Sequence, residues 1–264
     1  MSGPAVAAVL RRDLRLALSY RLNFLLTAGS SLFSAVLWFY LSAFVTVRGT
    51  EVPGGYFAFV MTGTVLLQYV TAALHGVSRR LGEEQAAGTL EFLLSSPAPP
   101  WGLLLASVLL DLLLRTADAL LLLGAGAALG LEFHLRHPLA LLVIAGLSVA
   151  SFAALGILAG SFLLVFQRGE PVTPLVGGLL ALLGGVFFPP SVLPPFLAAA
   201  ARLLPLSYAA DGLRAVLLEG KGLADLGGVL LPLAFFAALL LPLSFLAFAS
   251  ALRAARRYGL LGRY

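Results

Sequence analysis

Long apolar runs, separated by short polar or proline-containing segments, dominate the amino-acid sequence. A helix needs about 20 mainly apolar residues to cross a hydrocarbon core of about 30 Å. Six segments approach or exceed that length, and they are residues 22–45, 56–77, 101–130, 138–166, 172–188 and 227–251. The pattern therefore predicts an all-α polytopic membrane protein, with six transmembrane helices in a single domain.

A further apolar segment, residues 189–221, is interrupted by prolines at positions 189, 190, 194, 195 and 205. Each proline lacks the N–H that an internal helical residue donates, so a continuous span is not expected here. We expect short helices that lie at the membrane face or dip into it. A seventh span would require this segment to re-enter the membrane.

The segment before the first span, residues 4–20, has a helical rather than a continuous apolar pattern. Apolar residues recur every four positions, at Val6, Leu10, Leu14 and Leu18, and arginines occupy a neighbouring face. This pattern predicts an amphipathic helix in the plane of the membrane interface, with its arginines towards anionic headgroups. The alternative is a cytoplasmic extension of the first span.

The composition excludes a soluble protein. Of the 264 residues 60% are hydrophobic and only 11% are charged, whereas soluble domains carry about 25% charged residues. The net charge of +5 does not indicate nucleic-acid binding, because the basic residues follow the loops. The absence of cysteine from the sequence excludes disulfides, thiolate catalysis and cysteine-based metal sites.

The basic residues predict the orientation of the chain. With six spans both termini lie on one side, where eleven basic residues gather against five on the opposite side. The positive-inside rule then places both termini in the cytoplasm. The charged stretch at residues 79–96, between the second and third spans, faces the cytoplasm as well. It predicts a short helix, stopped by Pro97, that is suited to contact with another protein, although a solvated loop is the simpler alternative.

The third span contains three charged residues, Asp111, Arg115 and Asp118. Their spacings of four and three place them on one helix face. Each charge at mid-bilayer costs about 2.5–3.5 kcal/mol, so we expect them to neutralise one another within the helix. A structural role in packing and a role in gating or substrate contact both remain open.

Two separated motifs resemble a known family. The first has a Glu, then Gly-Thr-Leu-Glu, Leu-Leu and Ser-Pro, and its residues are Glu83, Glu84, Gly88, Thr89, Leu90, Glu91, Leu93, Leu94, Ser96 and Pro97. The second consists of Gly185, Phe187, Phe188, Pro189, Leu193, Pro194, Pro205, Ser207, Tyr208, Asp211 and Arg214. In this order and with six spans, they resemble the permease subunits of type-2 ABC exporters, of the multidrug and lipo-oligosaccharide kind.

The resemblance implies a role for each segment. Residues 4–20 would be the connecting helix, and residues 79–96 the coupling helix, seated in a groove of a separate ABC ATPase subunit. The coupling residues would be Arg79, Arg80, Glu83, Glu84, Gly88, Thr89 and Glu91. Residues 189–221 would form an extracytoplasmic cap, whose candidate residues, with two that precede it, are Phe187, Phe188, Pro189, Pro194, Tyr208, Asp211 and Arg214. Two copies, or one copy and a paralogue, would form the conduit in the lipid of a prokaryotic cell (inner) membrane.

The chain itself lacks a nucleotide-binding motif. A P-loop requires G-x-x-x-x-G-K-[ST], but the one lysine, Lys221, is followed by Gly222 and has Ala215 at the first glycine position. No cofactor is therefore expected on this chain, and the partner subunit would bind ATP and Mg²⁺. An intramembrane protease built on the pair Glu83 and Glu84 would need histidines on later spans. No histidine lies beyond His137, so this function is disfavoured.

Other transport functions remain open. A polysaccharide or lipid-linked glycan exporter would share the layout, and an ATP-independent secondary transporter or channel would need charges paired across spans. The sequence shows no charged pocket, which favours a hydrophobic or amphipathic substrate, drug-like or lipid-like. Glu132, His134 and His137 lie close together in one predicted turn, but three ligands on a loop are weak evidence for a metal, and we expect none.

Overall fold

The computed structural model describes residues 21–45, 54–86, 100–166 and 172–257. Within these ranges the chain forms helices and no strands, which confirms the all-α prediction. The long helices are α2 (Arg21–Ser42), α3 (Gly55–Ala86), α5 (Pro100–Ala128), α6 (Pro138–Phe166) and α10 (Gly227–Arg257). The shorter ones are α7 (Val172–Leu183), η1 (Pro190–Val192), α8 (Pro195–Ala201), α9 (Pro205–Leu217) and η2 (Leu223–Leu226).

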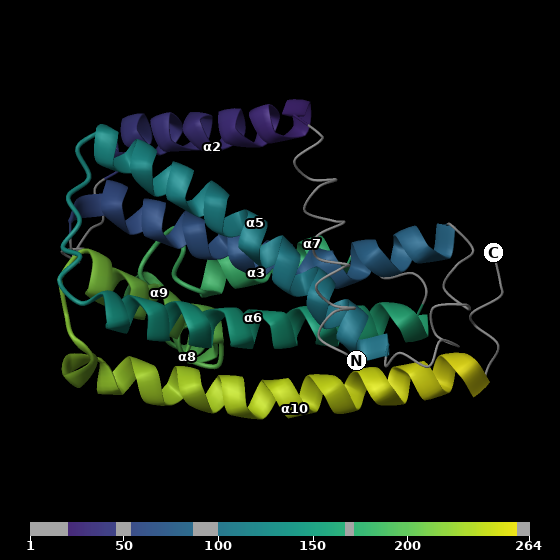
Figure 1. The fold of residues 1–264 in the computed structure, drawn as a ribbon. Helices are drawn as coiled ribbons and strands as arrows, with labels where there is room; N and C mark the ends of the chain where they lie inside the picture. Colours follow the sequence, from purple (N-terminus) through teal and green to yellow (C-terminus); the bar gives the residue numbers. More distant parts are fainter. Residues whose placement is uncertain (1–20, 46–53, 87–99, 167–171, 258–264) are drawn as a thin grey trace.

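The long helices form an elongated bundle with α6 at its centre. Figure 1 shows α6 between α3 and α10, with α2 on the far side of α3 and α5 crossing α3 near the middle of the bundle. α6 contains no charged residue and is apolar on all sides, as expected of a membrane-spanning helix. α3 ends and α5 begins at the end of the bundle where α10 ends (Figure 1). Residues 87–99, which join α3 to α5, lie outside the described residues.

Four of the described helices are long and apolar enough to cross a membrane, within Leu25–Ser42, Gly55–Gly76, Pro138–Leu164 and Leu223–Ala254. The chain is thus a multi-pass membrane protein. α5 has 29 residues but contains the three charges, and α7 has only 12 residues, about 18 Å of helix. The count of six spans stays a prediction.

The end of α7 differs from the expected span at residues 172–188. The helix stops at Leu183, because the chain turns through Gly185, whose φ of 71° belongs to the left-handed region that favours glycine. The apolar run continues past this turn to Phe188. Hydrophobicity therefore extends beyond the helix itself.

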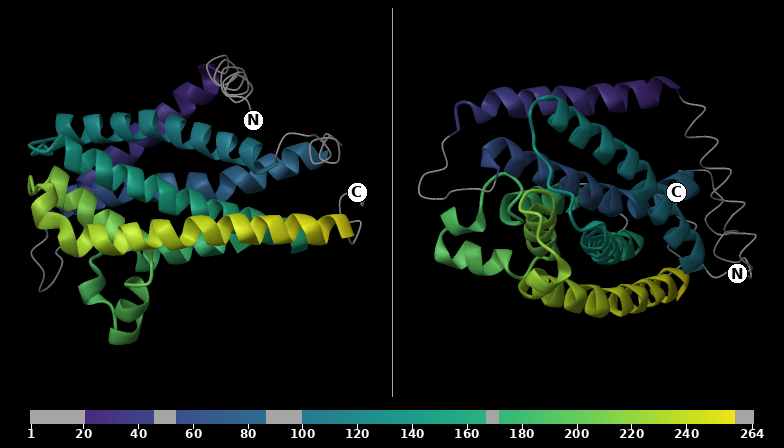
Figure 2. Two further views of the ribbon diagram at one scale, coloured as in Figure 1. Left: turned by 60° about the horizontal axis from the view of Figure 1, so that its bottom comes forward. Right: turned by 60° about the vertical axis from the view of Figure 1, so that its left-hand side comes forward.

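The proline-containing segment divides into short helices beside the start of α6 and α10 (Figure 2). η1, α8 and α9 each begin at a proline, because the first helical position has no intrahelical partner for an N–H. α9 packs against α3, α6 and α10 and is buried along most of its length. This short helix is therefore part of the core.

α3 continues beyond its expected membrane span. Residues 79–86 extend the same helix without a break, so the charged stretch does not begin as a separate helix. Arg80, Glu83 and Glu84 lie on this extension. Gly88, Thr89 and Glu91, like the expected amphipathic helix at residues 4–20, lie outside the described residues.

α3 and α6 approach each other closely where two small residues meet. A Cβ added at Gly156 of α6 would overlap the backbone carbonyl of Ala73 in α3, and Ala73 is fully buried. Small residues at such crossings bring helix backbones close together, and close van der Waals packing holds membrane helices together. This crossing fixes the central helix against α3.

Candidate functional site

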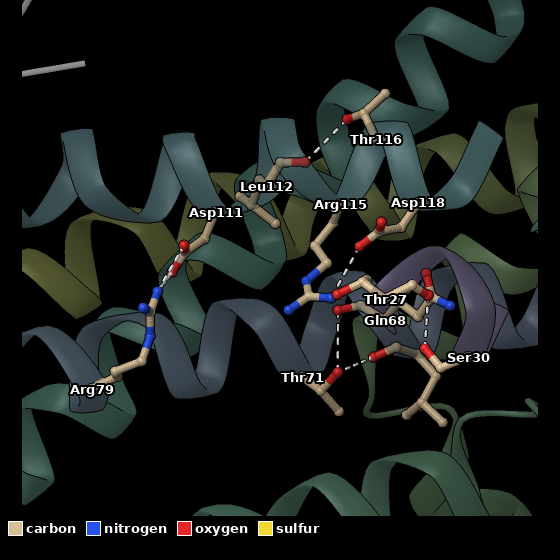
Figure 3. Close-up of polar contacts among 11 residues, drawn as sticks. Thr27, Ser30, Gln68, Thr71, Arg79, Asp111, Leu112, Arg115, Thr116 and Asp118 are labelled. Atoms are coloured by element: carbon tan, nitrogen blue, oxygen red, sulfur yellow. Dashed lines mark hydrogen bonds and ion pairs between the residues drawn. The ribbon is translucent and has the colours of Figure 1, made fainter. Parts of the chain in front are cut away.

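An ion pair joins α3 to α5, seven residues before the end of α3 and eleven residues after the start of α5 (Figure 3). Arg79 Nη2 donates hydrogen bonds to both carboxylate oxygens of Asp111, each at 2.8 Å. The Arg79 side chain is 60% exposed and that of Asp111 is 19% exposed. A charge-assisted pair of this geometry is among the stronger hydrogen-bonded contacts. It connects the two helices that enter and leave residues 87–99.

A glycine in α3 makes room for the Asp111 carboxylate. A Cβ at Gly76 would lie 2.7 Å from Asp111 Oδ2, closer than such atoms approach. Gly76 precedes Arg79 by three residues and so lies on the same helix face. The carboxylate can therefore lie directly against the surface of α3.

A second polar contact lies nearly three turns closer to the start of α3 than Arg79. The Tyr69 hydroxyl donates to Thr116 Oγ1 at 2.8 Å, and the Thr116 hydroxyl donates to the Leu112 carbonyl at 3.0 Å. Tyr69 and Gly76 are seven residues apart and share one face of α3. This spacing is the sequence signal that could have identified the α5-facing side of α3.

We expect Tyr69→Phe to have a small effect, because it removes one neutral hydrogen bond and retains the ring. The free energy of unfolding should fall by about 1 kcal/mol or less. Thermal unfolding in detergent would measure the effect. A fall of several kcal/mol would show that this hydroxyl holds α3 and α5 together rather than adding one hydrogen bond to a packed contact.

The expected neutralisation within α5 is confirmed for Arg115 and Asp118 and wrong for Asp111. Arg115 Nη1 donates to Asp118 Oδ2 at 3.0 Å, and Asp118 is buried. Asp111 instead binds Arg79 of α3, because the two helices approach each other there and the exposed arginine can reach across. The ion pair thus joins Arg79, one of the expected coupling residues, to Asp111, one of the three charged residues expected within the membrane.

The candidate cap residues lie in several different environments. The Phe187 ring packs on Trp38 of α2 with centroids 5.5 Å apart, and Tyr208 faces Phe236 of α10 at 6.0 Å. Phe188 is partly exposed, Pro189 is buried and Pro194 is exposed. The Asp211 side chain is 59% exposed, whereas that of Arg214 is 5% exposed. These residues do not form one exposed cluster.

Two smaller expectations concern Lys221 and the histidines. Lys221 Nζ lies 2.6 Å from Glu219 Oε2 in a half-exposed ion pair. Among the residues that the structure describes, no three potential metal ligands from His, Cys, Asp and Glu gather in one place.

Comparison with known proteins places these features in one family. A family model described as ABC-2 type transporter matches residues 5–218. The match includes α2 to α9, both sequence motifs and the Arg79–Asp111 pair. The comparison with curated proteins found no match.

Proposed function

Because the chain belongs to the ABC-2 type transporter family and is thus the membrane permease subunit of an ABC transporter, we propose that it exports a hydrophobic or amphipathic substrate, drug-like or lipid-like, across the cell membrane. We further propose six spans, both termini in the cytoplasm and a prokaryotic inner membrane. Large exposed apolar side chains occur on α2, α6 and α10, as expected of helices in contact with lipid, and the absence of a charged pocket from the sequence pattern supports a substrate of this class.

The observation that carries the proposal is the Arg79–Asp111 pair, which joins the helices before and after residues 87–99. The family implies an ABC ATPase partner in general, and we propose that residues 79–96 contact it. A push on this segment would act on α3 and α5 together, because the ion pair holds the two helices to each other. The ATPase would bind ATP and Mg²⁺, and closure of its two copies would tilt both helices.

The remaining coupling assignments extend this proposal. Arg80, Glu83, Glu84, Gly88, Thr89 and Glu91 would form the contact surface for the ATPase. We propose that a second copy of the chain, or a paralogue, completes the conduit, and that residues 189–221 cover its extracytoplasmic end.

Removal of the charge at Glu84 or Glu91 tests the coupling surface. In membrane vesicles that contain the permease and its ATPase, Glu84→Gln or Glu91→Gln should reduce permease-stimulated ATP hydrolysis at least threefold, because each change removes a charged contact. Membrane insertion should be unchanged. Glu132→Gln is the matched control, because Glu132 is exposed after α5, at the opposite end of that helix. Native stimulation in both coupling variants would contradict the assignment.

The direction of transport needs a separate experiment. Inside-out vesicles should take up a lipophilic fluorescent dye on addition of ATP, whereas right-side-out vesicles should not. Uptake of a lipid-linked glycan in place of the dye would favour the glycan exporter. Uptake without ATP or an ATPase would favour a secondary transporter.

A further inference from the structure

Arg214 is a buried cation at a junction of three elements. Its Nη2 atom donates to the Phe59 carbonyl of α3 at 2.9 Å and to the Gly185 carbonyl after α7 at 2.7 Å. Its Nε atom lies 3.3 Å from Thr62 Oγ1, and its guanidinium carbon lies 3.5 Å from the centre of the Phe59 ring. One side chain of α9 thus binds both α3 and the turn that ends α7.

Two glycines create the space for this arginine. A Cβ at Gly63 of α3 would lie 3.0 Å from Arg214 Nη2 and would overlap the Val186 carbonyl. Gly185 supplies its carbonyl from a left-handed turn, with φ at 71°. The backbones of α3 and of residues 185–186 therefore approach more closely than side chains would permit. The junction is built around the guanidinium.

The charge of Arg214 is retained although no carboxylate is close enough to form a hydrogen bond in the described part of the chain. Asp211 Oδ1 lies 3.9 Å from Nη1, and Nη1 is buried without a hydrogen-bond partner among the described residues. Burial lowers the pKa of Arg214 to about 10, so the side chain remains protonated at neutral pH. Carbonyl oxygens and an aromatic face stabilise a guanidinium in such places. The contact is therefore a permanent one rather than a titrating switch.

We infer that Arg214 is a positioning residue for transport, which locks α9 and the turn after α7 onto α3, so that movement of α3 at Arg79 is carried to the opposite end of the bundle. The inference rests on the proposed coupling through residues 79–96. Thr62 and Arg79 are 17 residues apart, about 26 Å of helix, and α3 contains no proline between them. An uninterrupted helix of that length moves largely as one body.

The test follows the two ends of the bundle separately. Because the sequence contains no cysteine, spin labels attached at introduced cysteines have no background from this chain. The pair Leu203→Cys and Leu231→Cys reports the α8–α9 region against α10, and both native side chains are exposed. The pair His75→Cys and Leu246→Cys reports the other end of α3 against α10. Distances would be measured in the complex with its ATPase, with and without ATP.

In the native background we expect ATP to change both distances. Arg214→Met should retain the change at the His75 pair, lose it at the Leu203 pair and reduce transport at least tenfold. Arg214→Lys should restore part of the transport, because an ammonium group can still donate to the two carbonyls. Thr62→Val removes one hydrogen-bond acceptor of Arg214 at nearly constant volume and should lower transport about threefold. If Arg214→Met does not fold, this variant tests the inference in its place. Arg253→Met is the matched control and should transport within twofold of the native protein, because Arg253 is exposed on α10 and donates to a carbonyl of its own helix.

The outcomes separate the two proposals. If the native His75 pair does not respond to ATP, the proposed coupling through α3 is wrong. If it responds, and the Leu203 pair keeps its full native response to ATP in Arg214→Met, or in Thr62→Val should Arg214→Met not fold, the inference about Arg214 is overturned. Loss of both responses in these variants would also overturn it, because Arg214 would then support the whole bundle rather than one junction.

Discussion

Of the single substitutions that we propose, Gly156→Val in α6 should lower the free energy of unfolding the most. The new side chain would overlap the backbone carbonyl of Ala73, and a backbone atom cannot move aside as the end of a flexible side chain can. Overpacking in a core costs about 1–3 kcal/mol and occasionally more. At about 3 kcal/mol, and at 2–4 °C per kcal/mol for a chain of this size, Tm should fall by about 6–12 °C. Thermal unfolding in detergent would measure it.

Gly146→Ala provides a control within the same helix. No atom lies within 4 Å of a Cβ at Gly146, so alanine should be neutral or slightly stabilising through its higher helix propensity. Equal behaviour of the Gly146 and Gly156 variants would mean that the α3–α6 crossing does not hold the bundle together.

The second large effect should follow reversal of the charge at Asp111. Asp111→Arg would place a guanidinium beside Arg79, with a repulsion of about 4 kcal/mol at 4 Å for an effective dielectric constant of 20 and about 1 kcal/mol in water. α3 and α5 should separate at this contact, and ATP-driven transport should fall at least tenfold. The native pair itself should contribute only about 1 kcal/mol or less to stability, because Arg79 is largely exposed. Tm should therefore change little in the neutral variant Asp111→Asn.

The double variant Arg79→Asp with Asp111→Arg should recover part of the transport, because it restores an ion pair with its partners exchanged. Vesicle transport and ATP hydrolysis, measured together, would show whether the lost step is coupling. Full transport by the single Asp111→Arg variant would exclude a mechanical role for the contact. A large fall in Tm in Asp111→Asn would assign the pair to folding instead.

The helices of the bundle were predictable to the extent that apolar runs mark them. The expected span at residues 138–166 has the bounds of α6 (Pro138–Phe166), because this run is apolar throughout. The end of α3 was not predictable in this way, because hydrophobicity marks the limit of the membrane and not the limit of the helix. Residues 79–86 are polar yet helical. The end of α7 was missed for the converse reason, since an apolar run conceals the backbone turn at Gly185.

The sites were only partly predictable, because helical spacing describes one helix at a time. The spacing of Asp111 and Arg115 suggested a partner within α5, whereas the partner of Asp111 is Arg79 of α3. Arg214 was expected in an extracytoplasmic cap, and no local pattern around it indicates that its side chain is buried against Phe59 and Gly185. Such contacts depend on which helices become neighbours, and that is a property of the packed bundle.

Because α3 is an uninterrupted helix, the number of residues between Thr62 and Arg79 fixes how its two ends are oriented relative to each other. One added or lost residue between Thr62 and Arg79 would turn one end of the helix by about 100° relative to the other and change its length by about 1.5 Å. Arg214 and Asp111 could then not both meet their present partners on α3. The number of residues in this stretch therefore fixes both the distance between the two contacts and their relative direction around the helix. Insertions and deletions here are constrained as strongly as substitutions.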